Sequence, residues 1–131
     1  MSKAYEFLKE CGVFFISTIN NEKPEVRPFG AIMEYDDQLY FSTSNSKKVY
    51  SQLIKNPYIQ IVALKEGTRN WIRISGKAIE IKDLEIKKKM FDCCPVLKKR
   101  FSSADCEYYS LFKLLREEAI LNVNDNIIYI D

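Results

Sequence analysis

The sequence contains no histidine among its 131 residues. This absence removes the commonest general base and the usual catalytic arrangements of serine and cysteine hydrolases. The four cysteines lack the Cys-x-x-Cys spacing of zinc sites, and no histidine is present to complete a mixed site. We therefore expect no metal centre, and if the protein is an enzyme, we expect a cofactor to carry the chemistry.

The sparse cysteines are Cys11, Cys93, Cys94 and Cys106. A strained disulfide between the adjacent Cys93 and Cys94 is one alternative, but in a reducing compartment we favour free, semi-buried thiols. The sequence assigns these cysteines no function.

Long apolar runs and a strong charge of one sign are also lacking. No run approaches the roughly 20 residues that cross a bilayer, and residues 1–6 lack the features of a signal peptide, so we expect a cytoplasmic protein. Twenty Lys and Arg oppose 18 Asp and Glu, and this net charge of +2 is too small by itself to indicate a nucleic-acid surface. The length and the 47% hydrophobic content suit one domain over residues 1–131.

Runs of β-branched and aromatic residues between turn residues predict a mainly β protein. We expect short helices at residues 2–11, with Ser2 as the cap and Gly12 as the stop, and at 46–55, 83–91 and 95–101. The segment 111–119 fits a strand but could also be helical. Six or seven strands with few helices indicate a small, mainly antiparallel barrel. The expected strands are 13–19, 25–35, 38–43, 58–64, 71–81, 109–123 and 127–130.

The most informative segment is residues 39–48, in which a strand ends on hydroxyl side chains and a helix opens with Ser46, Lys47 and Lys48. Free N–H groups at a helix start bind anions, and two ammonium groups make the same point cationic. Lysine at this end opposes the helix macrodipole, so its presence indicates an anionic ligand such as phosphate. The alternative is an exposed helix face on which both lysines are solvated and Ser46 is only a cap.

Two further segments carry candidate ligand contacts. Arg27 precedes Pro28, whose ring cannot donate to a strand ladder and therefore implies an edge or a bulge. Trp71 and Arg73 share one face of a strand, and Gly76 leaves room for another backbone to approach. The alternatives are an ordinary surface arginine and a tryptophan in the core or in a subunit contact. The basic runs 87–89 and 98–100 are interpreted as solvated faces.

The order and spacing of four segments resemble the flavin-binding split barrels of the pyridoxamine 5′-phosphate oxidase-like superfamily, including its nitroimidazole-resistance branch. These segments are 26–30, 39–43, 46–48 with Leu53 and Asn56-Pro57, and 71–76. The resemblance implies a six- or seven-stranded antiparallel split β-barrel with short flanking helices. It also implies a homodimer that holds FMN in a groove between its protomers.

By the same resemblance, Arg27 and Lys47 or Lys48 would hold the FMN phosphate with Ser42, Thr43 or Ser46. The segment 27–30 would run beside the isoalloxazine, and residues of the segment 70–73 would contact the flavin from one side or from the partner chain. The candidate cofactor-binding residues are therefore Arg27, Pro28, Phe29, Gly30, Phe41, Ser42, Thr43, Ser46, Lys47, Lys48, Asn70, Trp71 and Arg73.

The function that these features predict is an FMN-dependent oxidoreductase acting on a small molecule, with NAD(P)H as a candidate electron donor. A non-catalytic flavin-binding or storage protein is the alternative. A deazaflavin- or haem-binding relative and a single-stranded nucleic-acid-binding barrel are less favoured. Vitamin B6 oxidases of the superfamily use a C-terminal arginine segment that residues 127–131 lack, and nitroimidazole-resistance members typically carry a functional histidine. No residue therefore argues for either of these two activities.

Overall fold

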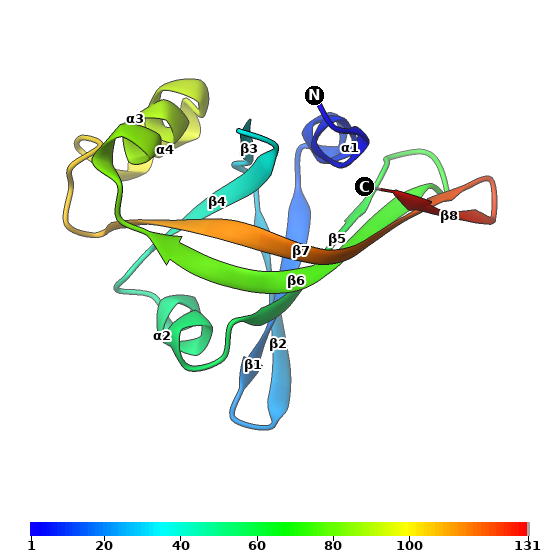
Figure 1. Ribbon diagram of the computed structural model, residues 1–131, viewed down its shortest axis with the longest axis horizontal. Coiled ribbons are helices and arrows are strands. Elements are labelled where there is room, and N and C mark those ends of the chain that lie inside the picture. Colours follow the sequence, from blue (N-terminus) through cyan, green and yellow to red (C-terminus); the bar gives the residue numbers. More distant parts are fainter. Residues whose placement is uncertain (131) are drawn as a thin grey trace.

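The computed structural model describes residues 1–130. Four short helices flank a single curved sheet (Figure 1). The helices are α1 (Lys3–Cys11), α2 (Lys48–Lys55), α3 (Leu84–Cys93) and α4 (Val96–Arg100). The strands are β1 (Phe14–Asn20), β2 (Lys23–Phe29), β3 (Met33–Tyr35), β4 (Gln38–Ser44), β5 (Tyr58–Leu64), β6 (Trp71–Ile81), β7 (Tyr109–Val123) and β8 (Asn126–Ile130).

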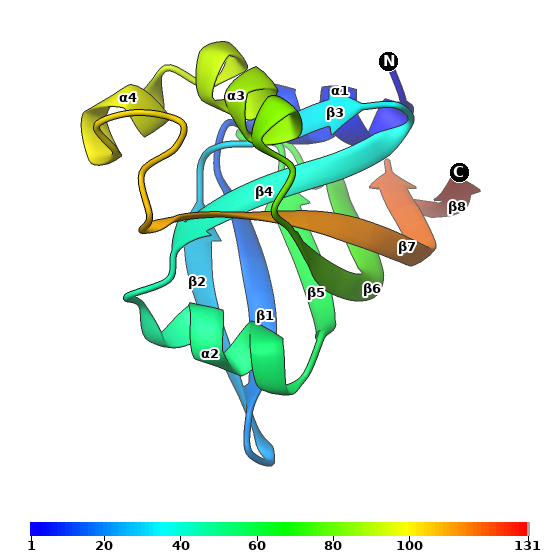
Figure 2. The ribbon, with the colours of Figure 1, turned by 60° about the vertical axis from the view of Figure 1, so that its left-hand side comes forward.

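The sheet contains eight strands in the described residues, and every pairing in it is antiparallel. Its order is β2-β1-β5-β6-β7-β4-β3, and β8 pairs with β7 beside this path. The long strands β6 and β7 cross the molecule together, while β1, β2 and β5 run down to one side of them (Figures 1 and 2). The predicted mainly β, antiparallel fold with short flanking helices is confirmed.

Two sequence predictions about the strands need correction. Residues 25–35 were expected to form one strand interrupted by Pro28 and Gly30, but the chain leaves the ladder after Phe29 and returns as a separate strand, β3, which pairs with β4 instead of β1. This break raises the strand number from six or seven to eight. The helical alternative for residues 111–119 is wrong, because β7 runs unbroken and pairs with β6 on one side and with β4 and β8 on the other.

The main core lies inside the curved sheet, where alternate residues of each strand turn inward. In β5, Ile59, Ile61 and Ala63 are buried while Val62 and Leu64 face outward. Each fully buried large side chain contributes about 1.5–3 kcal/mol relative to an exposed one. Helices α1 and α2 close this core with Ala4, Leu8, Val49 and Leu53.

A second, smaller core lies beneath α3 and α4. The strand β4 serves both cores, because Leu39 and Phe41 face the main core and Tyr40 faces the second. Burial on both faces explains why β4 is almost continuously apolar before its hydroxyl residues. The second core includes Met90, Leu97, Phe101, Tyr109 and Leu111.

Helix α1 begins and ends as the sequence predicts. The Tyr5 N–H donates to Ser2 Oγ at 3.1 Å, and Gly12 ends the helix with a φ of 76°. Helix α2 differs, because it begins at Lys48 and its cap residue is Lys47, which makes no side-chain capping bond. The interpretation of Ser46 as the helix cap is therefore wrong.

The prediction of a close backbone approach at Gly76 is confirmed. The pairing of β6 with β7 shifts register between Ser75 and Gly76. A Cβ atom at Gly76 would collide with the main-chain carbonyl oxygen of Leu115. In the described part of the chain, none of the helices combines the length and apolar character that crossing a membrane requires.

Candidate functional site

The junction between β4 and α2 is held to the loop before β7 by main-chain and side-chain bonds. The Asn45 N–H donates to the Tyr108 carbonyl at 3.0 Å, and Asn45 Nδ2 donates to the Glu107 carbonyl at 2.7 Å. Within the turn, the hydroxyls of Ser44 and Ser46 are hydrogen-bonded at 2.7 Å. The hydroxyl-rich end of β4 and the start of α2 are therefore fixed relative to one another.

A cavity of about 840 Å³ opens at this junction. Its volume lies within the range of about 300–1,000 Å³ that is usual for small-molecule sites. The cations Lys47 and Arg100 reach it from different elements, and no acidic residue is among its described lining residues. From the β4–α2 side it is lined by Ser42, Thr43, Ser44, Ser46 and Lys47, and from the α4 side by Leu97, Arg100, Phe101, Ser102, Cys106 and Tyr108.

The start of α2 adds a positive potential to this cavity. No side chain caps the first turn, which contains no acidic residue, and the helix opens with Lys47 and Lys48. The first N–H groups of a helix carry partial positive charge and attract anions. Hydroxyl donors, two cations and the helix start therefore favour an anionic group such as a phosphate.

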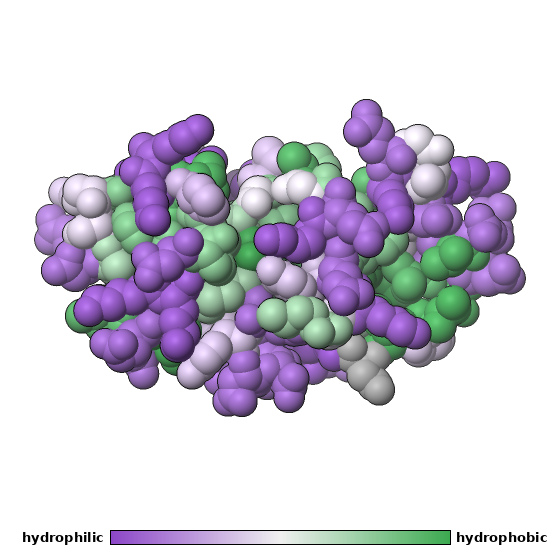
Figure 3. Space-filling model, turned by 90° about the horizontal axis from the view of Figure 1, so that it is seen from above, coloured by the Kyte–Doolittle hydropathy of each residue, from purple (hydrophilic) through white to green (hydrophobic). Residues whose placement is uncertain are grey.

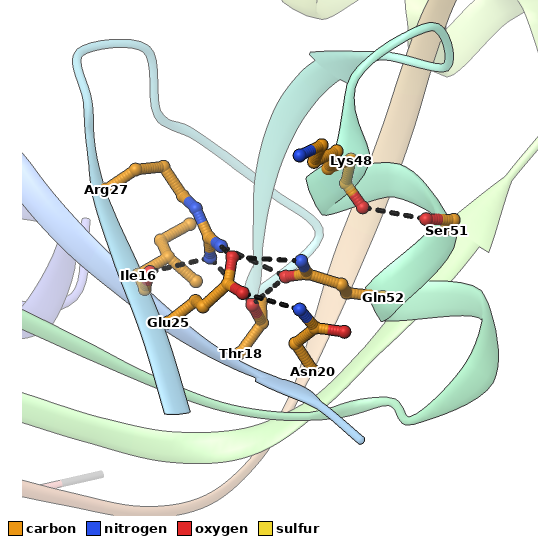
Figure 4. A network of polar contacts seen from close by, with 8 residues as sticks. All are labelled: Ile16, Thr18, Asn20, Glu25, Arg27, Lys48, Ser51 and Gln52. Atoms are coloured by element: carbon orange, nitrogen blue, oxygen red, sulfur yellow. Dashed lines mark hydrogen bonds and ion pairs between the residues drawn. The ribbon is translucent and has the colours of Figure 1, made fainter. Parts of the chain in front are cut away.

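Arg27 lies in a polar network between β2, β1 and α2 (Figure 4). Its Nη1 donates to the Thr18 hydroxyl at 2.8 Å and to the Ile16 carbonyl at 3.1 Å, and its Nη2 donates to Gln52 Oε1 at 3.0 Å. Burial lowers the pKa of Arg27, although Glu25 opposes this effect. These bonds attach β2 to α2 through one guanidinium group.

Glu25 is the acidic member of the same network. It accepts hydrogen bonds from Asn20 Nδ2 at 2.6 Å and from Gln52 Nε2 at 3.1 Å, and it lies 3.8 Å from the Arg27 guanidinium. The pKa of Glu25 is lowered, first by the Asn20 and Gln52 bonds and then by the charges of Arg27 and Lys48. Lys48 therefore lies within electrostatic reach of the network, one helical turn before Gln52 (Figure 4).

The predicted cationic residues are thus divided into two groups around the first turns of α2. Lys47 lines the cavity together with Ser42, Thr43 and Ser46. Arg27 and Lys48 lie around Glu25, and neither lines that cavity. Both groups lie near the start of α2. Arg27 does not reach the cavity that Lys47 lines, so the structure does not bring these two residues to one point.

The candidate cofactor-binding residues of the segment 28–30 and of β4 occupy different environments. Pro28 pairs with Phe15 of β1, and the Phe29 ring stacks on Phe14 at 6.0 Å and meets the edge of Phe41 at 5.7 Å. Phe41 is fully buried in the main core. Gly30 lies beside a smaller cavity between α1 and α3.

The segment 70–73 lies elsewhere on the sheet. The Arg73 guanidinium lies over the Trp71 ring at 5.5 Å, which confirms that they share a strand face. Asn70 Oδ1 accepts a bond from the Asn124 N–H at 3.0 Å. Because β7 separates β6 from β4 in the sheet, this segment does not join the cavity within one chain.

Arg100 is the charged residue that sequence reasoning missed among the described residues lining this cavity. It ends the basic run 98–100, which was interpreted as a solvated face. Leu97 and Phe101 anchor α4 in the second core, and this packing brings Arg100 to the cavity. No local pattern distinguishes Arg100 from Lys98 or Lys99, so only the tertiary packing identifies it.

The fold and sequence match known proteins. The sequence model of the family described as pyridoxamine 5′-phosphate oxidase matches residues 2–110. A NimC/NimA family protein from Clostridium acetobutylicum is 32% identical with a TM-score of 0.91, and the match covers 98% of this chain and 89% of that one. Comparison with curated proteins finds no match.

Two more distant structures show the fold alone. General Stress Protein 26 from Bacillus anthracis has 20% identity and a TM-score of 0.75, with 93% of this chain and 98% of that chain covered. A pyridoxamine 5′-phosphate oxidase-related, FMN-binding protein from Nostoc punctiforme has 16% identity and a TM-score of 0.72, with 88% and 76% covered. With the match over residues 2–110 and the NimC/NimA similarity, the chain belongs to the pyridoxamine 5′-phosphate oxidase family, in its nitroimidazole-resistance-like branch.

Proposed function

We propose that this protein binds FMN and catalyses the oxidation or reduction of a small molecule, with NAD(P)H as the candidate electron donor. The observation that carries the proposal is the cavity at the start of α2, where Lys47 and Arg100 meet the hydroxyls of Ser42 and Ser46. Family membership supports a flavin as the ligand, as does the description of the Nostoc punctiforme protein as FMN-binding.

The donor set fits the phosphate of FMN. Ammonium, guanidinium and hydroxyl groups are the partners that a phosphate dianion requires, and a charge-assisted bond is roughly twice as strong as a neutral one. In this proposal Lys47, Ser42, Thr43 and Ser46 hold the phosphate, and Arg100 approaches it from α4. Arg27 and Lys48 add positive charge from the side of α2 that faces β2. Bound FMN would supply hydride-transfer chemistry, while the residues of the chain bind and orient it.

We also propose that two copies of the chain form a homodimer through the outer face of β1, β5 and β6. This face exposes Phe15, Val62 and Leu64 by 42%, 40% and 58%, next to Trp71 and Arg73 on the neighbouring strand. An apolar patch rimmed by polar residues is typical of a protein contact. Across such an interface, Asn70, Trp71 and Arg73 would contact the flavin of the partner, which would explain their separation from the cavity of their own chain.

The cofactor is tested on the purified protein. We expect a yellow preparation whose visible spectrum is that of a bound flavin, and release of FMN on denaturation identified by chromatography. A colourless protein that also fails to quench the fluorescence of added FMN would refute the proposal.

A second candidate, a non-catalytic flavin-binding protein, is favoured by the cavity lining. Histidine and carboxylate side chains, the commonest general acids and bases, do not occur among its described lining residues. Stopped-flow mixing with NADH and NADPH separates the two candidates. Bleaching of bound flavin faster than that of free FMN supports the donor-linked enzyme, and bleaching no faster than that of free FMN supports the second candidate.

A further inference from the structure

Cys93 and Cys94 bring two sulfur atoms together at the end of α3. Their Sγ atoms are 3.4 Å apart. Cys93 is exposed, whereas Cys94 is buried and its thiol donates to the Ile32 carbonyl at 3.5 Å. The pair therefore offers one sulfur to solvent and holds a second directly behind it.

A disulfide is a poor product for this pair. Adjacent Cα atoms are about 3.8 Å apart across a trans peptide, which is below the usual disulfide range of about 4.4–6.8 Å. Such a bond is strained and is therefore easily reduced. The geometry consequently favours two free thiols, which are available to bind a thiophilic ligand together.

The sulfur separation indicates the kind of atom that can bridge the two thiols. For bonds of about 2.3 Å to sulfur, a bridging angle of about 95° spans about 3.4 Å, a tetrahedral angle about 3.8 Å and a linear arrangement about 4.6 Å. Trivalent arsenic forms three pyramidal bonds at angles near a right angle, so it matches the observed 3.4 Å better than tetrahedral zinc or two-coordinate mercury.

The number of protein ligands available at this pair also favours trivalent arsenic. The residues that the structure describes contain no group of three His, Cys, Asp or Glu side chains that could hold a metal ion. A two-sulfur site therefore suits an atom that brings its own third substituent. A monosubstituted arsenical meets this condition, because its organic group occupies the third position.

A small cavity next to the sulfurs can accommodate that organic group. It has a volume of about 220 Å³ and lies between α1, α3 and the segment before β3. A cavity of about 150 Å³ is large enough to hold benzene. Apart from Lys9, the side chains that line it are apolar. Figure 3 shows hydrophobic residues between hydrophilic side chains on this helical side, seen from above. The lining includes Leu8, Gly12, Ile32, Pro95 and Val96 together with both cysteines.

We propose that Cys93 and Cys94 form a two-sulfur binding site for trivalent arsenicals that carry one organic substituent, which lies in the cavity between α1 and α3. In the reaction, two arsenic–oxygen bonds break and two arsenic–sulfur bonds form. The two thiol protons leave with the oxygen as water, so no atom is oxidised or reduced. This site is separate from the cavity at the start of α2 and does not depend on flavin binding.

Phenylarsine oxide is the probe for the experiment, which uses the full-length reduced protein and intact-mass spectrometry. We expect a single phenylarsenic adduct that survives an excess of 2-mercaptoethanol and is removed by the dithiol 2,3-dimercaptopropanol. Cys93→Ser and Cys94→Ser should each weaken binding by at least about a hundredfold, because the second bond of a chelate forms within the molecule. The double variant Cys11→Ser with Cys106→Ser should retain the adduct.

Circular dichroism checks that the variants are folded. Because Cys93 is exposed, Cys93→Ser should remove one sulfur without disturbing the second core. The proposal is overturned if wild-type protein forms no monothiol-resistant adduct. It is also overturned if a folded Cys93→Ser variant keeps that adduct, or if the Cys11 and Cys106 double variant loses it.

Discussion

At the scale of single residues, the positive charge around the start of α2 comes from three separate segments. The sequence predicts the contributions of Lys47 and Lys48 because lysine at a helix start opposes the macrodipole. It does not predict that Arg27 is held by Thr18 and Gln52, because that contact depends on how α2 crosses β1. It also misses Arg100, which only the packing of α4 brings to the cavity.

Replacement of both Lys47 and Lys48 by alanine tests the proposed phosphate contact. We expect FMN affinity to fall by about 3 kcal/mol, roughly a hundredfold, because the charge-assisted bond from Lys47 to the phosphate and the nearby positive charge of Lys48 are both lost. Fluorescence titration with FMN measures the change. Lys55→Ala, at the opposite end of the same helix, is the matched control and should bind as the wild type does. An unchanged dissociation constant in the double variant would contradict the assignment.

Arg100→Ala tests the cavity residue that the structure adds. Loss of one charge-assisted contact should weaken FMN binding by about tenfold. Lys99→Ala removes the neighbouring charge of α4 without altering the cavity lining and should have little effect. Equal effects of the two substitutions would mean that Arg100 acts only through the general charge of the helix.

The thiol of Cys93 should react at lower pH than an ordinary cysteine. The pKa of Cys93 is lowered to about 7, first by the hydrogen bond between Cys93 and Cys94 and then by the Lys9 charge, while burial and Asp92 oppose the shift. Because the thiolate is the nucleophile, the rate of iodoacetamide alkylation should rise through about pH 7. Burial raises the pKa of Cys11, so that thiol should react only at higher pH and serves as the internal comparison.

Lys9→Gln should move the Cys93 rate profile to higher pH, because the favourable charge near the thiolate is removed. Lys3→Gln changes a lysine on the same helix and should leave the profile in place. Peptide mapping after timed alkylation assigns the rates to each cysteine. Superimposable profiles for Cys93 and Cys11 would disprove the predicted difference.

At the scale of elements, alternating residues identify most strands but do not reveal where a strand changes partner. The inward and outward residues of β5 and β6 follow the sequence pattern directly. Pro28 and Gly30 indicate an interruption within residues 25–35, but neither residue reveals that the chain leaves β1 after Phe29 and pairs with β4 instead. Residues 111–119 look ambiguous because the first part of β7 contributes side chains to both cores while residues 115–118 are exposed, and this removes a simple alternation.

Gly76→Ala tests the close approach of β6 and β7. A methyl group there would collide with the Leu115 carbonyl, which belongs to the main chain and cannot move aside by rotating. We expect a loss of about 2–3 kcal/mol in the free energy of unfolding. Denaturant titration measures the loss, and the adjacent Ser75→Ala should cost about 1 kcal/mol or less through its hydrogen bond with Gln60. A Gly76→Ala variant as stable as the wild type would show that the two strands can separate at little cost.

At the scale of the whole molecule, the proposed dimer accounts for two features that a single chain leaves unexplained. One is the apolar outer face of β1 and β5, and the other is the position of Trp71 and Arg73 away from the cavity. The sequence suggests a subunit contact for Trp71 only as one of two alternatives. The extent of the apolar face depends on the register of β1, β5 and β6, which sequence alone does not supply.

Val62→Glu should convert the protein from a dimer to a monomer, because a carboxylate would be buried in an apolar interface. Light scattering coupled to size-exclusion chromatography measures the mass of each form. Leu84→Glu, which changes an equally exposed apolar residue on α3, should leave the dimer intact. A wild-type protein that elutes as a monomer would remove the basis for contacts across two subunits.

The strand β2 forms one end of the sheet, and its composition has a consequence for solubility. Pro24 and Pro28 lie within this strand, and neither has an N–H group to offer to an added strand. An open sheet edge is otherwise a template for pairing between molecules and for fibril growth. The prolines therefore interrupt that template, so the molecule can keep an unpaired edge beside its polar network without promoting aggregation there.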